Sequence, residues 1–210
     1  GAPFESDGRV RHLAELKTRP GAFDVCDDIT SGYAEGFCRS RGQTLDDGAR
    51  QAELDALGRG LLPAAVAPYA SLRKAAYAWA EARGGNEVDL SGTARAAMVI
   101  DEEEDNRTAF VALVKRILAG AVPVASPARA KAADAALNAA YRAVKARGQH
   151  VQEFGTVEFT GVLAAQRAWL RYRDAVIAFA HAQSPGRSTD GVFVALTEAR
   201  TAQLVELASP

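Results

Sequence analysis

The sequence predicts an all-α protein folded as a helical bundle, on three observations. Alanine is abundant, and alanine has the highest helix propensity of the amino acids. Apolar residues recur at spacings of three and four, the period of an amphipathic helix, and scarcely alternate with polar ones as in a half-buried strand. The composition, 48% hydrophobic and 24% charged, is that of a soluble globular chain. Its 210 residues suffice for one large domain or two small ones.

Stretches that contain glycine or proline separate the helical segments and indicate where each one ends. Thr44 and Ser126 have side chains suited to N-caps, and Pro127 suits the first position of a helix. The helices expected on this basis span residues 8–18, 31–40, 44–59, 64–84, 91–119, 127–147, 155–183 and 189–208.

The segment AGAVPVASPA, residues 119–128, divides the chain into two halves that resemble each other. We expect an N-terminal helical half over residues 1–120, which holds both cysteines, and a C-terminal half over residues 121–210. Alanine-rich helices match by chance, but two tryptophans in register are harder to dismiss, so we interpret the halves as a degenerate tandem repeat. The matched positions are Trp79 with Trp169, Arg83 with Arg173, and Arg107-Thr108-Ala109 with Arg200-Thr201-Ala202.

The two cysteines, Cys26 and Cys38, allow either a disulfide or two free thiols, and we favour the disulfide. On one straight helix their Cα atoms would lie about 18 Å apart, whereas a disulfide needs about 4.4–6.8 Å. Pairing therefore requires a chain reversal, and the turn and cap residues Thr30, Ser31 and Gly32 can provide it. A disulfide would indicate an oxidising compartment. The histidines are scattered, so a zinc site is not expected.

Charge and motifs argue against several classes of function. The formal net charge of −1 gives no support to nucleic-acid binding, which usually needs a basic face. No stretch approaches the roughly 18–20 unbroken apolar residues of a transmembrane segment. The chain has no Gly-rich phosphate loop with Gly-Lys-Ser/Thr and no Gly-x-Ser-x-Gly elbow. We therefore expect no catalytic residue, no cofactor and no metal.

Three stretches resemble the LprI-like lysozyme-inhibitor family of exported bacterial helical domains. The first is the cysteine pair, with eleven residues between, followed by a helix. The second, ADAALNAAYRAV over residues 133–144, is similar to the family's Leu-Asn-x-x-Tyr helix. The third, LAAQRAWLRYRDA over residues 163–175, is similar to its Gln-Arg-x-Trp-x-x-x-Arg-Asp stretch. The two motifs are carried by Leu137, Asn138, Tyr141, Gln166, Arg167, Trp169, Arg173 and Asp174.

This resemblance implies export, and therefore a periplasmic or secreted protein whose signal peptide has been removed. It is also compatible with a lipid anchor on the full-length form. It strengthens the expectation that Cys26 and Cys38 pair. The sequence also departs from the family pattern. Val176-Ile177 stands where the family often has a cysteine, and Gly58 stands in the first copy where a tyrosine would. Across such differences, the resemblance predicts the fold better than it predicts inhibitor activity.

The third motif admits a structural and a functional interpretation. On a helix, Gln166, Trp169 and Arg173 share one stripe. Trp169 is most simply a core anchor, with Arg173 either folded over its ring or paired with a carboxylate of a neighbouring helix. We favour this structural interpretation, a polar network that fixes helix register, over a direct binding site.

Two features are candidates for binding a protein partner. The acidic run Asp101, Glu102, Glu103, Glu104 and Asp105 would steer a basic partner such as a lysozyme, or would merely form a solvated face. In the loop SPGRSTDG, residues 184–191, Pro185 and Gly186 would shape a protrusion. Arg187 and Ser188 would then reach into a hydrolase cleft, unless the loop is a plain helix connection.

Two hypotheses of function follow. In the first, the protein is a non-catalytic periplasmic or secreted inhibitor that occludes a lysozyme or another peptidoglycan hydrolase, including the case of an immunity protein. In the second, it is an assembly or interaction module of the cell envelope without a hydrolase target.

Overall fold

The computed structural model describes residue 14, residues 24–152 and residues 155–209, and within these ranges the protein is all-α. The predicted fold class is therefore confirmed. The expected helix over 8–18 lies outside the described residues, Ala14 aside. The described residues form no strand, and one isolated β-bridge pairs His150 with Glu158. The α-helices are α2 (Gly32–Gly58), α3 (Val66–Glu87), α4 (Arg95–Leu118), α5 (Pro127–Ala146), α6 (Phe159–Gln183) and α7 (Asp190–Ala208), with short 3₁₀-helices η1 (Val25–Asp28) and η2 (Pro63–Ala65).

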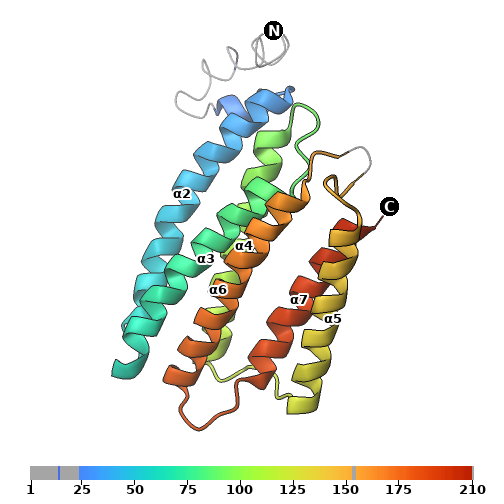
Figure 1. The fold of residues 1–210 in the computed structure, drawn as a ribbon. Helices are drawn as coiled ribbons and strands as arrows, with labels where there is room; N and C mark the ends of the chain where they lie inside the picture. Colours follow the sequence, from blue (N-terminus) through green and yellow to red (C-terminus); the bar gives the residue numbers. More distant parts are fainter. Residues whose placement is uncertain (1–13, 15–23, 153–154, 210) are drawn as a thin grey trace.

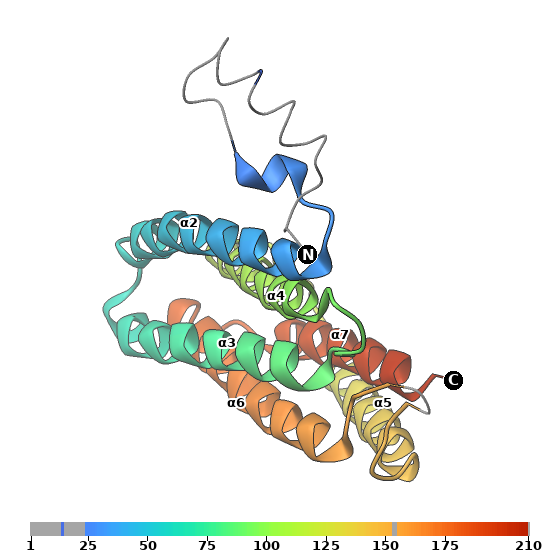
Figure 2. The same cartoon turned by 90° about the horizontal axis from the view of Figure 1, so that it is seen from above.

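The long helices run side by side in one bundle (Figure 1). Helix α3 contacts both α4 and α6 extensively, while α2 packs on α4 and α5 packs on α7 (Figure 2). The contact between α6 and α7 is less extensive. The α4–α5 linker and the α6–α7 loop lie at the same end of the bundle, so residues far apart in the sequence meet there (Figure 1).

Helix α2 corrects one expected boundary. We expected a break at residues 40–43 and a new helix capped by Thr44, but α2 is continuous from Gly32 to Gly58. The Thr44 hydroxyl donates to the Ser40 carbonyl four residues back and so does not cap a helix start. Gly42 lies inside the helix, because packing along α4 outweighs the low helix propensity of a single glycine.

Most of the other boundaries agree with the sequence. The Ser126 hydroxyl accepts from the Arg129 amide and caps α5, with Pro127 in the first turn, as predicted. Helix α3 continues past its expected end at residue 84, because Gly84 lets α4 approach closely: a Cβ there would lie 3.0 Å from the Val99 carbonyl oxygen. Helix α4 begins at Arg95, four residues later than expected.

The cysteines Cys26 and Cys38 form a disulfide, with their Cα atoms 5.7 Å apart. Cys26 lies in η1 and Cys38 in α2, and the chain reverses between them. The Ser31 hydroxyl caps α2 by accepting from the Ala34 amide, at the turn that the sequence predicted. The disulfide therefore fastens η1 to the first turns of α2.

Removing this disulfide should destabilise the protein. Closing a loop of this length restricts the unfolded chain, and the chain-entropy estimate is about 3 kcal/mol. We expect Cys26→Ser/Cys38→Ser to lower the free energy of unfolding by about that amount in urea titrations, and reducing agent to have no further effect on the variant. Two titratable thiols in the denatured, non-reduced protein would contradict the pairing.

One hydrophobic core runs through the bundle and includes both tryptophans. Trp79 on α3 is 4% exposed and Trp169 on α6 is 3% exposed. The core also takes side chains from α2, α4, α5 and α7, with Leu54, Phe110, Val144 and Leu204 fully or almost fully buried. Both halves thus share a single core, while the tandem repeat itself stays a prediction.

The α3–α4 loop is joined to the segment that precedes α6. The Asp89 carboxylate accepts from the hydroxyl and amide of Ser91 and from the amide and hydroxyl of Thr156. These hydrogen bonds stabilise the charged carboxylate and lower the pKa of Asp89 to about 2.

Candidate functional site

A buried polar network links the two halves around Arg200 of α7. Its guanidinium is fully buried and donates to both carboxylate oxygens of Glu87, at 2.7 and 2.5 Å. Its Nε donates to the Gln166 amide oxygen at 2.8 Å, and the group stacks on the Trp79 ring at 4.9 Å. Because Glu87 and Trp79 belong to α3 and Gln166 to α6, this arginine joins α7 to both helices.

The tryptophan motif packs between α6 and α7. Arg173 lies over the Trp169 ring, 5.3 Å from its centroid, and over the Phe193 ring of α7 at 5.4 Å. Its carboxylate partner is the adjacent Asp174, not a residue of a neighbouring helix. The buried Trp169 and the aromatic ring of α7 thus enclose one guanidinium between two helices.

The remaining motif residues are divided between core and surface. Leu137 is buried, and Tyr141 packs its ring against Phe159 at the start of α6. Asn138 is exposed and donates to the Asp134 carboxylate and carbonyl one turn earlier. Arg167 is exposed on α6. These positions stabilise helices and helix contacts and do not converge on one cavity.

The acidic run is largely paired within the chain. Its carboxylates contact arginines of the same chain, and the side chains of Glu102, Glu103 and Glu104 are only 17–23% exposed. Four of the five acids have such a partner: Asp101 pairs with Arg39, Glu102 with Arg83, Glu103 with Arg107, and Glu104 with both Arg50 and Arg107. Much of their charge is therefore neutralised inside the bundle.

Burial also changes the pKa of one of these arginines, Arg83. Desolvation lowers the pKa of the Arg83 guanidinium, opposed by the carboxylates of Glu102 and Glu87. Arginine nevertheless stays protonated at neutral pH. Neutralising Glu102 or Glu103 would thus remove one of the carboxylate partners of Arg83 or Arg107, in addition to any effect on association with another protein.

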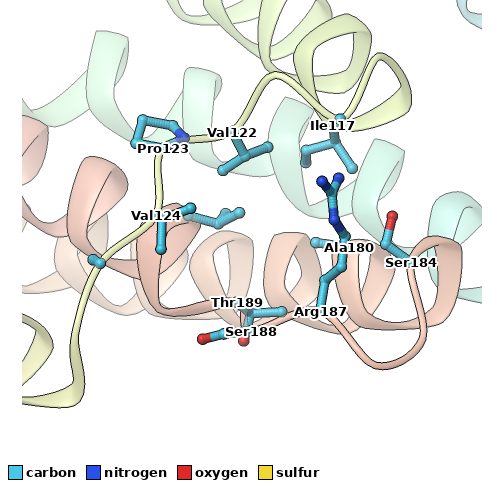
Figure 3. Close-up of a pocket in the computed structure, with 12 residues that line it drawn as sticks. Ile117, Val122, Pro123, Val124, Ala180, Ser184, Arg187, Ser188 and Thr189 are labelled. Atoms are coloured by element: carbon cyan, nitrogen blue, oxygen red, sulfur yellow. The ribbon is translucent and has the colours of Figure 1, made fainter.

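The loop residues Arg187 and Ser188 lie at a cleft of about 240 Å³ between the α4–α5 linker and the α6–α7 loop (Figure 3). Its apolar lining comes from α4, the linker, α6 and α7. Hydroxyl groups are added by the loop that joins α6 to α7. The lining residues are Ile117, Gly120, Val122, Pro123, Val124, Ala125, Ala180, Ser184, Arg187, Ser188, Thr189 and Val192.

The α6–α7 loop is a tight turn and does not form an extended protrusion. The Arg187 amide donates to the Ser184 carbonyl across Pro185 and Gly186, and Gly186 has φ +87°. Proline at the second position and a positive-φ glycine at the third are typical of a type II turn. The Ser188 hydroxyl accepts from the Asp190 amide and so satisfies a donor at the start of α7.

The Arg187 side chain turns back along the cleft (Figure 3). Its guanidinium lies over Gly120, where an added Cβ would be 2.8 Å from Nη1. Gly120 has φ +67° and follows the last turn of α4, with the Ala121 amide bonded to the Arg116 carbonyl. Glycine there provides both the left-handed helix end and the space for the arginine.

We did not predict from the sequence that the linker forms the other wall of this cleft. Its backbone passes directly over the first turn of α7, where a Cβ on Gly191 would lie 1.5 Å from the Pro123 carbonyl oxygen. Val124 is left 97% exposed beside the cleft. The one local signal is Gly191 itself, because a glycine in a first helical turn permits such a close approach of another backbone.

Two further properties concern the described part of the chain. No helix there is both long enough and apolar enough to cross a membrane. No cluster of three or more His, Cys, Asp or Glu side chains within those residues is arranged to hold a metal ion.

Residues 124–204 match the model of a protein family described as lysozyme inhibitor LprI. This segment, called the LprI segment below, is similar to that family. No curated protein and no solved structure matches the chain. The LprI segment begins inside the α4–α5 linker and contains both helix motifs and the α6–α7 loop, whereas the disulfide lies outside it.

Proposed function

We propose that this protein is an LprI-type inhibitor, which binds and blocks a lysozyme or another peptidoglycan hydrolase and performs no chemistry itself. The observation that carries the proposal is the match of residues 124–204 to a family of lysozyme inhibitors. Such an inhibitor would act outside the cytoplasm, in the periplasm or as a secreted or lipid-anchored protein. An immunity protein would have the same activity, directed at a hydrolase that the same cell produces.

The surface that best suits such a partner is the bundle end that carries the cleft. It lies within the LprI segment, apart from the end of α4 and the first linker residues. The exposed apolar side chain of Val124 and the exposed Arg187 line the same cleft, and apolar anchors together with arginines are typical of protein interfaces. The acidic run supports the proposal less, because its carboxylates are paired within the chain.

Inhibition should be stoichiometric and should depend on Arg187. A panel of lysozymes and bacterial lytic enzymes is titrated with the purified protein, and we expect at least one to be blocked near a 1:1 ratio. Arg187→Ala should weaken that inhibition about 30-fold or more, mainly through faster dissociation, because a desolvated charge pair is lost.

Arg171→Ala is the matched control, because Arg171 is an exposed arginine on α6 that does not line the cleft. It should inhibit as the wild type does. If every hydrolase stays fully active at excess protein, the proposed function is wrong. The second hypothesis, an assembly or interaction module of the cell envelope, then replaces it. If Arg187→Ala inhibits like the wild type, the contact surface lies elsewhere.

A further inference from the structure

The cleft contains a charged group whose interactions are incomplete. Arg187 is the only charged side chain among the described residues that line it. No described carboxylate pairs with its guanidinium, whereas Arg173 and Arg200 both have such partners. A guanidinium presents five N–H donors in a planar fork, which matches a carboxylate in a two-point contact.

The surroundings of Arg187 also suit an anion. The hydroxyls of Ser184, Ser188 and Thr189 line the same cleft. Ser188 already accepts a hydrogen bond from the Asp190 amide, and its own O–H is left to donate. The arginine and the hydroxyls of the α6–α7 loop are thus the side-chain hydrogen-bond donors that line this cleft, and a carboxylate there would contact the guanidinium.

The rest of the cleft lining is mostly apolar. Ile117 from α4, Val122 from the linker and Val192 from α7 form this apolar wall, and Ile117 and Val122 lie next to the Arg187 guanidinium (Figure 3). The cleft encloses about 240 Å³, whereas sites for whole small molecules usually enclose about 300–1,000 Å³. Its size therefore suits a single side chain or chain terminus and is too small for a sugar chain.

We propose that this cleft binds a carboxylate carried on a short aliphatic stem, with the carboxylate at Arg187 and the stem against the apolar wall. The carboxylate comes from a side chain or a chain terminus of the partner. In this arrangement the partner inserts a group into the cleft of this protein. An inhibitory plug would do the reverse and insert a loop of this protein into the partner. Only the identification of that partner as a hydrolase rests on the proposed function.

Carboxylate binding is measured on the whole protein, labelled with ¹⁵N and titrated with propionate. We expect saturable shifts of the Arg187 Nε–H resonance and of the Gly120 and Val192 amides. Propionamide, which has the same shape without the charge, should cause none. Arg187→Met should weaken propionate binding about tenfold or more. Arg187→Lys should retain part of it, and Arg171→Met should bind like the wild type.

Several results would overturn the proposal. Equal shifts with propionamide would show that the charge is not recognised. Equal binding of chloride would indicate a general anion site, and unchanged binding by a folded Arg187→Met variant would exclude the arginine. Thermal unfolding of each variant shows that it is folded.

Two peptides distinguish the sources of the carboxylate. N-acetyl-glycyl-alanine offers a chain terminus, and N-acetyl-glycyl-glutamyl-glycinamide offers a side chain alone. Preferential binding of either supports the proposal and identifies the source, while binding of neither contradicts it. The readout needs no hydrolase, so a failure of hydrolase inhibition and a failure of carboxylate binding are separate results.

Discussion

Replacing Arg200 by alanine is expected to lower the free energy of unfolding by about 3–5 kcal/mol, since it breaks a buried ion pair. The change removes both hydrogen bonds to Glu87 and leaves that carboxylate, whose side chain is 2% exposed, with only the more distant Arg83 at 3.9 Å. It also leaves the buried Gln166 amide oxygen without its donor. Urea titrations of the wild type and the variant measure the loss.

The matched control is Arg129→Ala, which breaks an ion pair between α5 and α7 at the surface. Arg129 and Glu198 are 62% and 46% exposed, so their pair should contribute only about 0–1 kcal/mol. A second comparison replaces both buried partners. Glu87→Met/Arg200→Met should be more stable than either single alanine variant, because no uncompensated charge remains. A loss below about 1 kcal/mol in Arg200→Ala would contradict the role assigned to this pair.

The ion pair also illustrates what a sequence pattern does not contain. The helical nature of the segments around Glu87 and Arg200 follows from local periodicity. Their pairing joins positions 113 residues apart in different halves of the chain. The repeat singled out Arg200 only as the counterpart of Arg107, and nothing in the local sequence marks either arginine as buried. That information lies in the tertiary arrangement, which brings the Arg200 side chain of α7 to the end of α3.

The partners of the acidic run also come mostly from distant parts of the sequence. Five adjacent acids on a predicted helix are typical of a solvated face, and their local sequence holds only one of the arginines that pair with them. The others come from neighbouring helices: Arg39 and Arg50 lie on α2 and Arg83 lies on α3. By contrast, the start of α5 depends on adjacent residues, Ser126 and Pro127, and was predicted correctly.

The candidate site was predictable in part. The loop that holds Arg187 could be found because Pro185 and Gly186 mark a turn between two helical segments. The second wall of the cleft could not, because the linker meets this loop only when α4 and α6 end on the same side of the bundle (Figure 1). A cleft built from two loops explains why Arg187 lies along a wall and not at the tip of a protrusion.

Truncating Trp169 to alanine should cost about 3–5 kcal/mol, the usual range for a buried aromatic side chain. The ring is 3% exposed and fills the core between α6 and its neighbours. Trp79→Ala should cost a similar amount if the two halves are copies of one unit. Tyr33→Ala is the control: it also truncates an aromatic ring, but one that is 85% exposed, and should change stability by at most about 0.5 kcal/mol.

The loss in Trp169→Ala should extend to α7, because Arg173 lies between the Trp169 and Phe193 rings. Without the tryptophan, one face of the guanidinium is left without an aromatic partner, and the contact with Phe193 weakens too. We therefore expect the double variant Trp169→Ala/Phe193→Ala to be more stable than the sum of the single losses predicts, by about 0.5–3 kcal/mol. Strictly additive losses in urea titrations would show that Arg173 does not couple α6 to α7, and the motif would then stabilise α6 alone.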